Sequence, residues 1–454
     1  MSIDIEPHEE ESNKTLHLTV NVASNNSNNS DDINEVEDID EEEYEIPDIV
    51  KITNNFRDNI RSIQVFVEVI GKLADEHDTK TIKTCLDPLE EMFKKLKKEF
   101  FERIEKEEND EDKLTVKEKD ELEKYLQENI NGKEILNTFK KMNNSAPRQG
   151  ELLRKNSLIT LLSTFETLIS NLIQEYYTRF PQALPNDTKK LTLAEIKELG
   201  SVEEAERFII DSEIDSILRG DILSQLDYFE KKLKFNSNYI SEYKDYLVET
   251  SQRRNILVHN DGVINKHYLK KTPNKFLTEE FNEGKRIKVN SKYLLERIEL
   301  IHIIGIILIQ ECFRRWTKKF DECNELLIEI IFESLQESKY SFIEKLSKYI
   351  NSIELYNEKD RKVLVINYCL TLKKQNKINE MKKELEKHDW SAVSDDFNLA
   401  LAILNNEDEI FYKELNNLII TNKMNSEMMG SWPLFDEYRE KEQFKQILVS
   451  LKNK

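Results

Sequence analysis

Three polar side chains near the middle of the 454-residue chain have types and a spacing suited to phosphate chemistry. Arg254, Asn255 and His259 lie in a helix predicted from about Asn238 to His259, where Asn255 and His259 are one turn apart and share a face. A guanidinium binds phosphate oxygens through several N–H donors, and an imidazole gains or loses a proton near neutral pH. An arginine and a histidine placed in this way are functional groups that a ribonuclease uses.

Arg254 falls on the inward-facing stripe of that helix. The other inward positions, at steps of three and four, are Ile240, Tyr243, Leu247, Thr250 and Leu257. Because an unpaired buried guanidinium costs several kcal/mol, Arg254 should face a pocket, a buried acid or a partner chain. Glu166, on the flank of another apolar stripe, could pair with it as possible support for the site. His259 directly precedes Asn260-Asp261-Gly262, a turn sequence that predicts the end of the helix.

Other catalytic motifs are missing from the sequence. It has no glycine-rich phosphate loop, no Gly-x-Ser-x-Gly and no His-Glu-x-x-His, and its four cysteines show no metal-binding spacing. We therefore expect neither a metal nor a cofactor. Without a metal cluster, the nucleophile of an RNA-cutting reaction is expected to be the substrate's own 2′-OH.

The segment from Gln252 to Lys292 is the most basic part of the chain, with ten Lys and Arg against four acids and a net charge of +6. Such a segment could hold an RNA backbone, with aromatic side chains stacking on bases, or it could be an ordinary solvated loop. The residues expected to hold the backbone are Arg253, Lys266, Lys270 and Lys271, and those expected to stack on bases are Tyr268 and Phe276.

The elements that position these residues are predicted to be helices. Glycine and proline are scarce, at 9 and 8 residues, which favours an all-α fold. Apolar periodicity and charge divide the chain into four parts. They are an acidic, disordered tail over 1–48, an N-terminal helical domain over 49–148, a bundle of four main helices over 149–320, and a C-terminal helical-repeat domain of the tetratricopeptide type over 321–454.

A long helix from about Val289 to Phe320 is apolar almost all round and should form the buried centre of the four-helix bundle. Its longest apolar stretch, Leu300 to Ile309, is about half of the ~20 residues that cross a bilayer. With an acidic amino terminus, this predicts a cytoplasmic protein without membrane contact. In the C-terminal part, Trp390 and Trp432 could line a groove for a protein partner or simply pack in the core.

The run from Arg254 to His259 resembles the Arg-polar-x-x-x-His signature of the HEPN superfamily, all-helical domains that include many RNA-cleaving toxins and antiviral effectors. Thr164 to Glu166 on the opening helix, and the residues from His259 to Leu269, are similar to prokaryotic members. The resemblance covers about residues 149 to 319.

In active members of that superfamily two domains pair, and RNA is cut without metal in a cleft lined by both copies. The resemblance implies that Arg254 binds the scissile phosphate, His259 transfers protons, and Asn255 orients either His259 or the phosphate. It implies a homodimeric endoribonuclease in a toxin or antiviral-defence setting. Apart from the resemblance, the C-terminal helical repeats could bind a protein partner or an activator. The alternative is a non-catalytic HEPN dimerisation scaffold.

Overall fold

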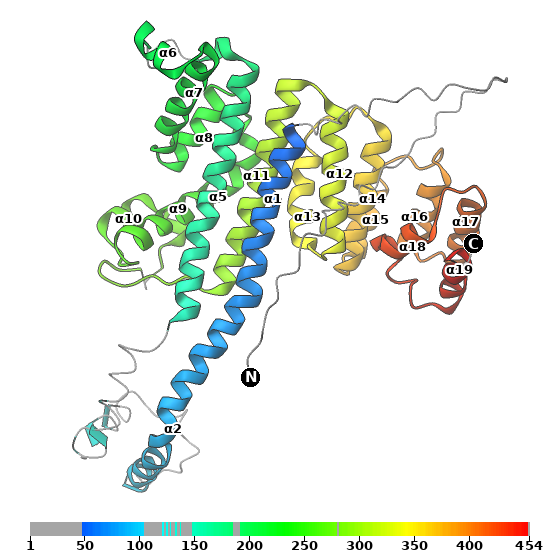
Figure 1. Ribbon diagram of the computed structural model, residues 1–454. Helices are drawn as coiled ribbons and strands as arrows, with labels where there is room; N and C mark the ends of the chain where they lie inside the picture. The colour runs from blue at the N-terminus through cyan, green and yellow to red at the C-terminus, as the bar shows by residue number, and fades with distance from the viewer. Residues whose placement is uncertain are drawn as a thin grey trace, which may run out of the picture. The chain divides into compact units, whose positions relative to one another are not determined.

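The computed structural model describes residues 48–103, 148–184, 191–278 and 281–452, with a few separate residues between 120 and 137. Over this part of the chain every regular element is a helix, which confirms the all-α class (Figure 1). The acidic tail up to residue 47 and most of 104–147 lie outside the described residues. Predictions made for those segments therefore remain predictions.

Four helices share the central core: α1 (Asp48–Val65), α5 (Gln149–Arg179), α9 (Lys244–His259) and α11 (Ser291–Thr317). Helices α1, α5 and α11 pack against one another, and α9 packs on α5 and α11 (Figure 1). Helix α11 is buried at every position from Leu300 to Arg314, so the prediction of a buried central helix is confirmed. The domain limits predicted at residues 148 and 320 remain predictions.

Helix α1 packs closely on α11 at a glycine of α11. A Cβ atom on Gly305 of α11 would lie 2.3 Å from the ring of Phe56 on α1, so only glycine allows this close approach. After α1 the chain passes through a π-helical segment, Phe66–Ile70, into α2 (Gly71–Arg103), which packs on α5. Arg154 of α5 joins α2 through two hydrogen bonds to the Asp75 carboxylate, of 2.8 and 2.7 Å.

Shorter helices surround α5 and α9. They are η3 (Pro181–Ala183), α6 (Leu193–Leu199), α7 (Val202–Leu218), α8 (Ile222–Lys231), η4 (Ser237–Tyr243), α10 (Lys266–Lys271) and η5 (Asn274–Phe276). Helix α7 packs on α5, while α8 and α10 pack on α9. The predicted helix from Asn238 to His259 is thus a 3-10 segment followed by α9.

Successive helices follow α11: α12 (Phe320–Gln336), α13 (Tyr340–Ile350), α14 (Glu358–Lys374), α15 (Ile378–Leu385), α16 (Asp395–Asn405), α17 (Asp408–Ile420), α18 (Ser426–Ser431), η6 (Pro433–Phe435) and α19 (Glu442–Lys452). Most pack on a helix next to them in sequence, and the tetratricopeptide-type assignment remains a prediction. Trp390 and Trp432 are both half-buried against the core. Among the described helices none is long and apolar enough to cross a membrane.

Candidate functional site

Helix α9 ends at His259, as the sequence predicts. The backbone N–H groups of Asn260 and Gly262 both donate to the carbonyl of Ile256, at 2.9 Å. Gly262 has φ of 77°, in the left-handed region that favours glycine, and a Cβ there would lie 3.0 Å from the carbonyl oxygen of Ile287. The helix ends in this turn, and the His259 side chain is exposed.

Arg254 forms an ion pair with Glu166 of α5, so the pairing expected from the sequence is present. Neither side chain is deeply buried, with 21% of Arg254 and 30% of Glu166 exposed. The Nε atom of Arg254 is buried without a hydrogen-bond partner. A phosphate could reach only the part of the Arg254 side chain that makes up this exposed 21%.

Around α9, Val258 and Asn255 lie between Arg254 and His259, which are about 140° apart. Asn255 is half-buried, His259 is exposed, and Val258 between them is 46% exposed. Within the described part of the chain, neither Asn255 nor His259 has a hydrogen-bond or ion-pair partner. We refer to Arg254, Asn255, Val258 and His259 as the open face of α9.

Arg253 lies on a different side of α9 and is buried, so the expectation that it contacts RNA is wrong. Its Nε donates to the Glu249 carboxylate at 2.7 Å, and a terminal nitrogen donates to the carbonyl of Lys288 at 3.2 Å. Its guanidinium lies 3.9 Å from the ring centre of Tyr293. A count of basic residues cannot distinguish a buried, paired arginine of this kind from an exposed one.

Tyr268 is also buried, so it cannot stack on bases as expected. Burial and the nearby Glu249 charge raise the pKa of Tyr268 to about 12, and its hydroxyl donates to that carboxylate at 3.4 Å. Phe276 is half-buried and lies edge-on against Tyr246, with ring centres 5.0 Å apart.

The remaining basic candidates lie at the surface. Lys266, Lys270 and Lys271 of α10 are exposed, and Lys271 lies 3.7 Å from Asp221. They stay candidates for contacts with an RNA backbone.

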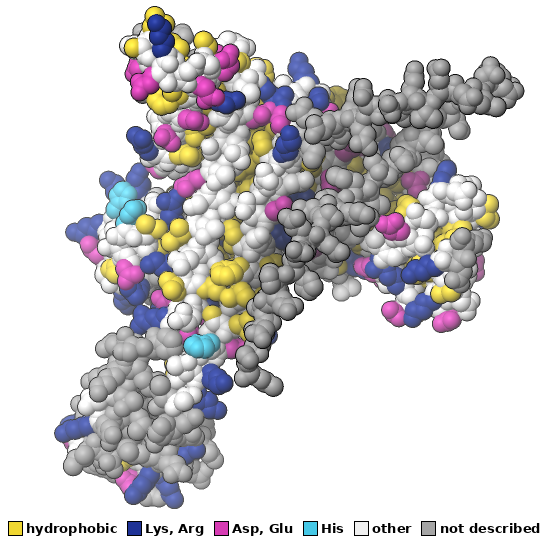
Figure 2. Space-filling model, in the orientation of Figure 1, with side chains coloured by type: hydrophobic (Ala, Val, Ile, Leu, Met, Phe, Trp, Pro, Cys, Tyr) yellow, Lys and Arg dark blue, Asp and Glu magenta, His cyan; other side chains and the backbone are white. Residues whose placement is uncertain are grey.

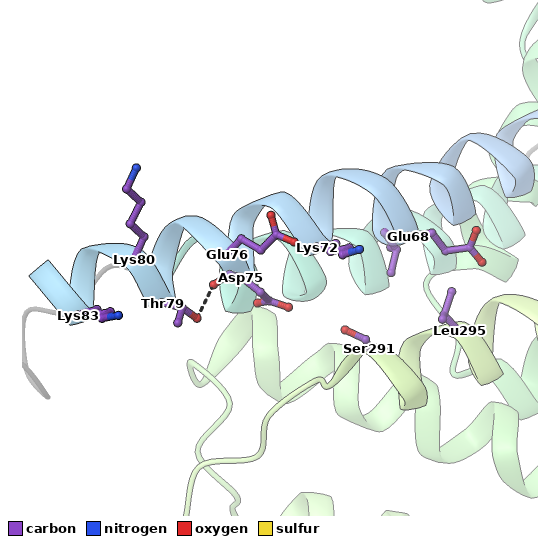
Figure 3. Close-up of a pocket in the computed structure, with 10 residues that line it drawn as sticks. Glu68, Lys72, Asp75, Glu76, Thr79, Lys80, Lys83, Ser291 and Leu295 are labelled. Carbon is purple, nitrogen blue, oxygen red and sulfur yellow. Dashed lines mark hydrogen bonds between the residues drawn. The ribbon is translucent and has the colours of Figure 1, made fainter.

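A shallow groove of about 670 Å³ lies between α2 and the first turns of α11 (Figure 3). Its lining residues are Val67, Glu68, Lys72, Asp75, Glu76, Thr79, Lys80, Lys83, Ser291 and Leu295. None of them belongs to α9, so the open face lies outside this groove. The described residues contain no group of three or more His, Cys, Asp or Glu that could hold a metal ion.

Sequence reasoning missed Glu249, a completely buried carboxylate on α9. The available signal was its position four residues before Arg253, the spacing of a helical ion pair, in a stretch that also carries the inward stripe. Comparisons with family models, with curated proteins and with solved structures found no match for this chain. Its functional interpretation therefore depends on the open face and on the motif within it.

Proposed function

We propose that the chain is an endoribonuclease of the HEPN type that cuts single-stranded RNA through the 2′-OH of its substrate. The observation that carries this proposal is the open face, where a partly exposed arginine and an exposed histidine share one helix. The superfamily assignment is part of the proposal and depends on the motif from Arg254 to His259.

In this mechanism the 2′-oxygen attacks the adjacent phosphorus and forms a new P–O bond. A base takes the proton of the 2′-OH, the bond from phosphorus to the 5′-oxygen breaks, and an acid donates a proton to that oxygen. The products are a 2′,3′-cyclic phosphate and a 5′-hydroxyl. His259 is the proton-transfer group and Arg254 stabilises the phosphate charge, while Asn255 orients either His259 or the phosphate. Each role is worth about 10²–10⁴ in rate.

The reaction needs a base and an acid, whereas one chain supplies a single exposed histidine on the open face. We therefore propose that two copies pair and that the second His259 completes the site. An exposed apolar surface supports this pairing. The most exposed positions of α5 from Leu152 to Thr178 carry no charge, and five large apolar residues of the neighbouring α1–α2 segment are 42–56% exposed. Figure 2 shows hydrophobic side chains gathered on this surface. The five residues are Val65, Phe66, Val69, Ile70 and Leu73.

Pairing is tested by light scattering at micromolar concentration, where we expect the mass of two chains. Replacing Phe66 and Val69 by Asp should give a single chain with unchanged helicity, because charges in an apolar interface are desolvated without partners. A wild-type protein that is monomeric throughout would contradict the two-copy site.

The activity is tested by incubating purified protein with single-stranded RNA in EDTA and identifying the product ends. Wild type should cut and leave cyclic phosphate ends, and His259→Ala should not. His267→Ala is the matched control, because it removes another exposed histidine only eight residues away and should keep full activity. A stable dimer that neither binds nor cuts RNA would instead indicate the non-catalytic scaffold.

The cellular role is also a proposal. We propose a cytoplasmic toxin or antiviral-defence effector whose C-terminal helical-repeat part docks an activator or partner protein. Induced expression of wild type, but not of His259→Ala, should arrest growth and degrade cellular RNA. Equal growth with both proteins, at equal expression and with the activator present, would contradict this role.

A further inference from the structure

A stack of alternating cations and aromatic rings runs along the side of α9 that carries Arg253. Lys275 lies 4.5 Å from the ring centre of Tyr246, and Arg297 lies 5.1 Å from the same ring. Arg297 also lies 4.6 Å from the ring centre of Tyr293, which has Arg253 at 3.9 Å. The stack thus joins an exposed lysine to a buried arginine through two tyrosine rings, with an attractive cation–π contact at each step.

Glu249 is a carboxylate at the buried end of this stack. It accepts hydrogen bonds from Arg253 Nε and from the Tyr293 hydroxyl, both at 2.7 Å, and Arg297 Nε lies 3.7 Å away. Two buried guanidinium groups therefore depend on one completely buried negative charge. Removing that charge leaves both cations in a low-dielectric site without compensation.

The stack and Glu249 hold the segment that follows α9, which we call the arm (residues 260–278 and 281–289). The arm has its own small core, where Ile264, Tyr268 and Ile287 pack with Ile256 of α9. Its two ends are joined by hydrogen bonds of 2.8 Å, from Ile264 N to the Lys285 carbonyl and from Ile287 N to the Gly262 carbonyl.

Three contacts tie the arm to the network on α9. Glu249 accepts from the hydroxyl of Tyr268, Arg253 donates to the carbonyl of Lys288, and Lys275 lies over Tyr246. These contacts come from three separate parts of the arm. Together they therefore fix the position of the whole arm and not only of a single point on it.

We propose that Glu249 is a positioning residue that latches the arm onto α9 and thereby sets how tightly RNA is held. The dependence of RNA affinity rests on the proposed function, because the arm carries Lys266 and Lys270 and begins directly after His259. The latch itself does not depend on it. Glu249 contacts neither the open face nor its ion pair, so it acts on RNA binding and not on the chemical step.

The test is amide hydrogen exchange of the full chain, comparing wild type with Glu249→Gln, which keeps the side-chain shape and removes the charge. Glu311→Gln is the matched control. Glu311 is a buried glutamate of α11 that also accepts from a tyrosine, Tyr349 at 2.9 Å, and pairs with an arginine four residues on, Arg315 at 3.4 Å. It makes no contact with the arm. A second variant, Tyr246→Ala, removes the ring between Lys275 and Arg297 at the exposed end of the stack, and it is expected to fold even if Glu249→Gln does not.

We expect arm amides to exchange at least about tenfold faster in Glu249→Gln and in Tyr246→Ala, but not in Glu311→Gln. In a His259→Ala background, a labelled single-stranded RNA should bind about tenfold more weakly to the same two variants. With His259 restored, the cleavage rate at saturating RNA should stay within about threefold of wild type, whereas a general structural defect would lower it together with affinity.

Unchanged arm exchange in both latch variants would overturn the latch. Faster arm exchange with unaltered RNA affinity would overturn its role in binding. If wild type neither binds nor cuts RNA, but arm amides still exchange faster in the two latch variants than in wild type, the proposed function is wrong and the latch is supported.

Discussion

Two faces of helix α9 carry adjacent arginines that have opposite environments. Arg253 is buried against Glu249, which is 0% exposed, whereas Arg254 is paired with Glu166, whose side chain is 30% exposed. One residue along a helix turns a side chain by about 100°, which is enough to separate a structural position from an open one.

The difference shows how to separate structural charge from chemical charge in this protein. A buried ion in a low-dielectric site must have a fixed partner, since losing the partner costs several kcal/mol. A partly exposed ion pair contributes little to stability, so its members can exchange one partner for another at small cost. The open face therefore has groups that can meet a phosphate, and the Arg253 face has groups that cannot.

The largest expected effect follows from removing groups of the open face. His259→Ala and Arg254→Ala should each lower the cleavage rate by about 10²–10⁴, because one loses proton transfer and the other loses phosphate stabilisation. Single-turnover cleavage measures this, and urea unfolding should show stability within about 1 kcal/mol of wild type. Variants that keep cutting would place the active site elsewhere.

Arg253→Ala should instead have its main effect on stability. It should lower the free energy of unfolding by about 3 kcal/mol, because the buried Glu249 loses its closest counter-charge. Urea unfolding followed by circular dichroism measures the loss. If Arg253→Ala is as stable as Arg254→Ala, the contrast between the two faces is wrong.

A buried titratable group without a partner should affect the pH dependence of the free energy of unfolding. His302 of α11 is such a group. Its Nε2 is buried with no hydrogen-bond partner, and burial, with the nearby Arg57 and Lys339 charges, lowers its pKa well below 6.5. The folded state keeps His302 neutral while the unfolded chain binds a proton below about pH 6.5, so acid favours unfolding. The free energy of unfolding should fall below that pH by up to about 1.4 kcal/mol per pH unit from this group.

His302→Leu should remove this part of the pH dependence, which unfolding curves at pH 7.5, 6.5 and 5.5 would show. The difference between wild type and variant isolates His302 from the carboxylates that titrate in the same range. Equal slopes would mean that the imidazole can take up a proton in the folded chain.

The surface lysines should affect affinity alone. Replacing Lys266 and Lys270 with Ala should weaken RNA binding by about tenfold and lower the slope of log affinity against log salt by roughly 0.7 per lost phosphate contact. Binding titrations at several salt concentrations test this. An unchanged slope would show that neither lysine meets the RNA backbone.

The smallest expected effect concerns Glu166. Its carboxylate competes with a phosphate for Arg254, so Glu166→Gln should tighten RNA binding by about threefold and change stability by less than about 1 kcal/mol. The same titration measures it. Weaker binding would show that Glu166 supports the site by orienting Arg254 more than it competes.

Periodicity was sufficient to predict the features that depend on a single helix. The all-helical class, the buried centre at Leu300 to Ile309 and the helix end at His259 each follow from local spacing or turn chemistry. The pairing of Glu166 with Arg254 was also accessible, because each residue interrupts or borders an apolar stripe and needs a partner.

The network on the other face could not be predicted in the same way. Tyr268 and Tyr293 reach Glu249 from 19 and 44 residues further along the chain, and only the folded arm and α11 bring them there. Composition placed Arg253 and Tyr268 in a basic surface segment, since it records charge and aromatic content without showing which side chains the tertiary structure buries. Both predictions were wrong for the same physical reason, because Arg253 and Tyr268 are buried where they donate to the Glu249 carboxylate.

If the open face cuts RNA with the substrate's own 2′-OH, removing that hydroxyl from one nucleotide should protect one bond. After the cleaved bond of an RNA oligonucleotide has been mapped, the nucleotide before that bond is replaced by its 2′-deoxy form, and cutting is measured in EDTA. Cleavage at that bond should fall at least as far as it does for His259→Ala on the unmodified RNA, because the nucleophile itself is removed. Cleavage of the 2′-deoxy substrate at the rate of the unmodified RNA would show that the 2′-OH is not the nucleophile.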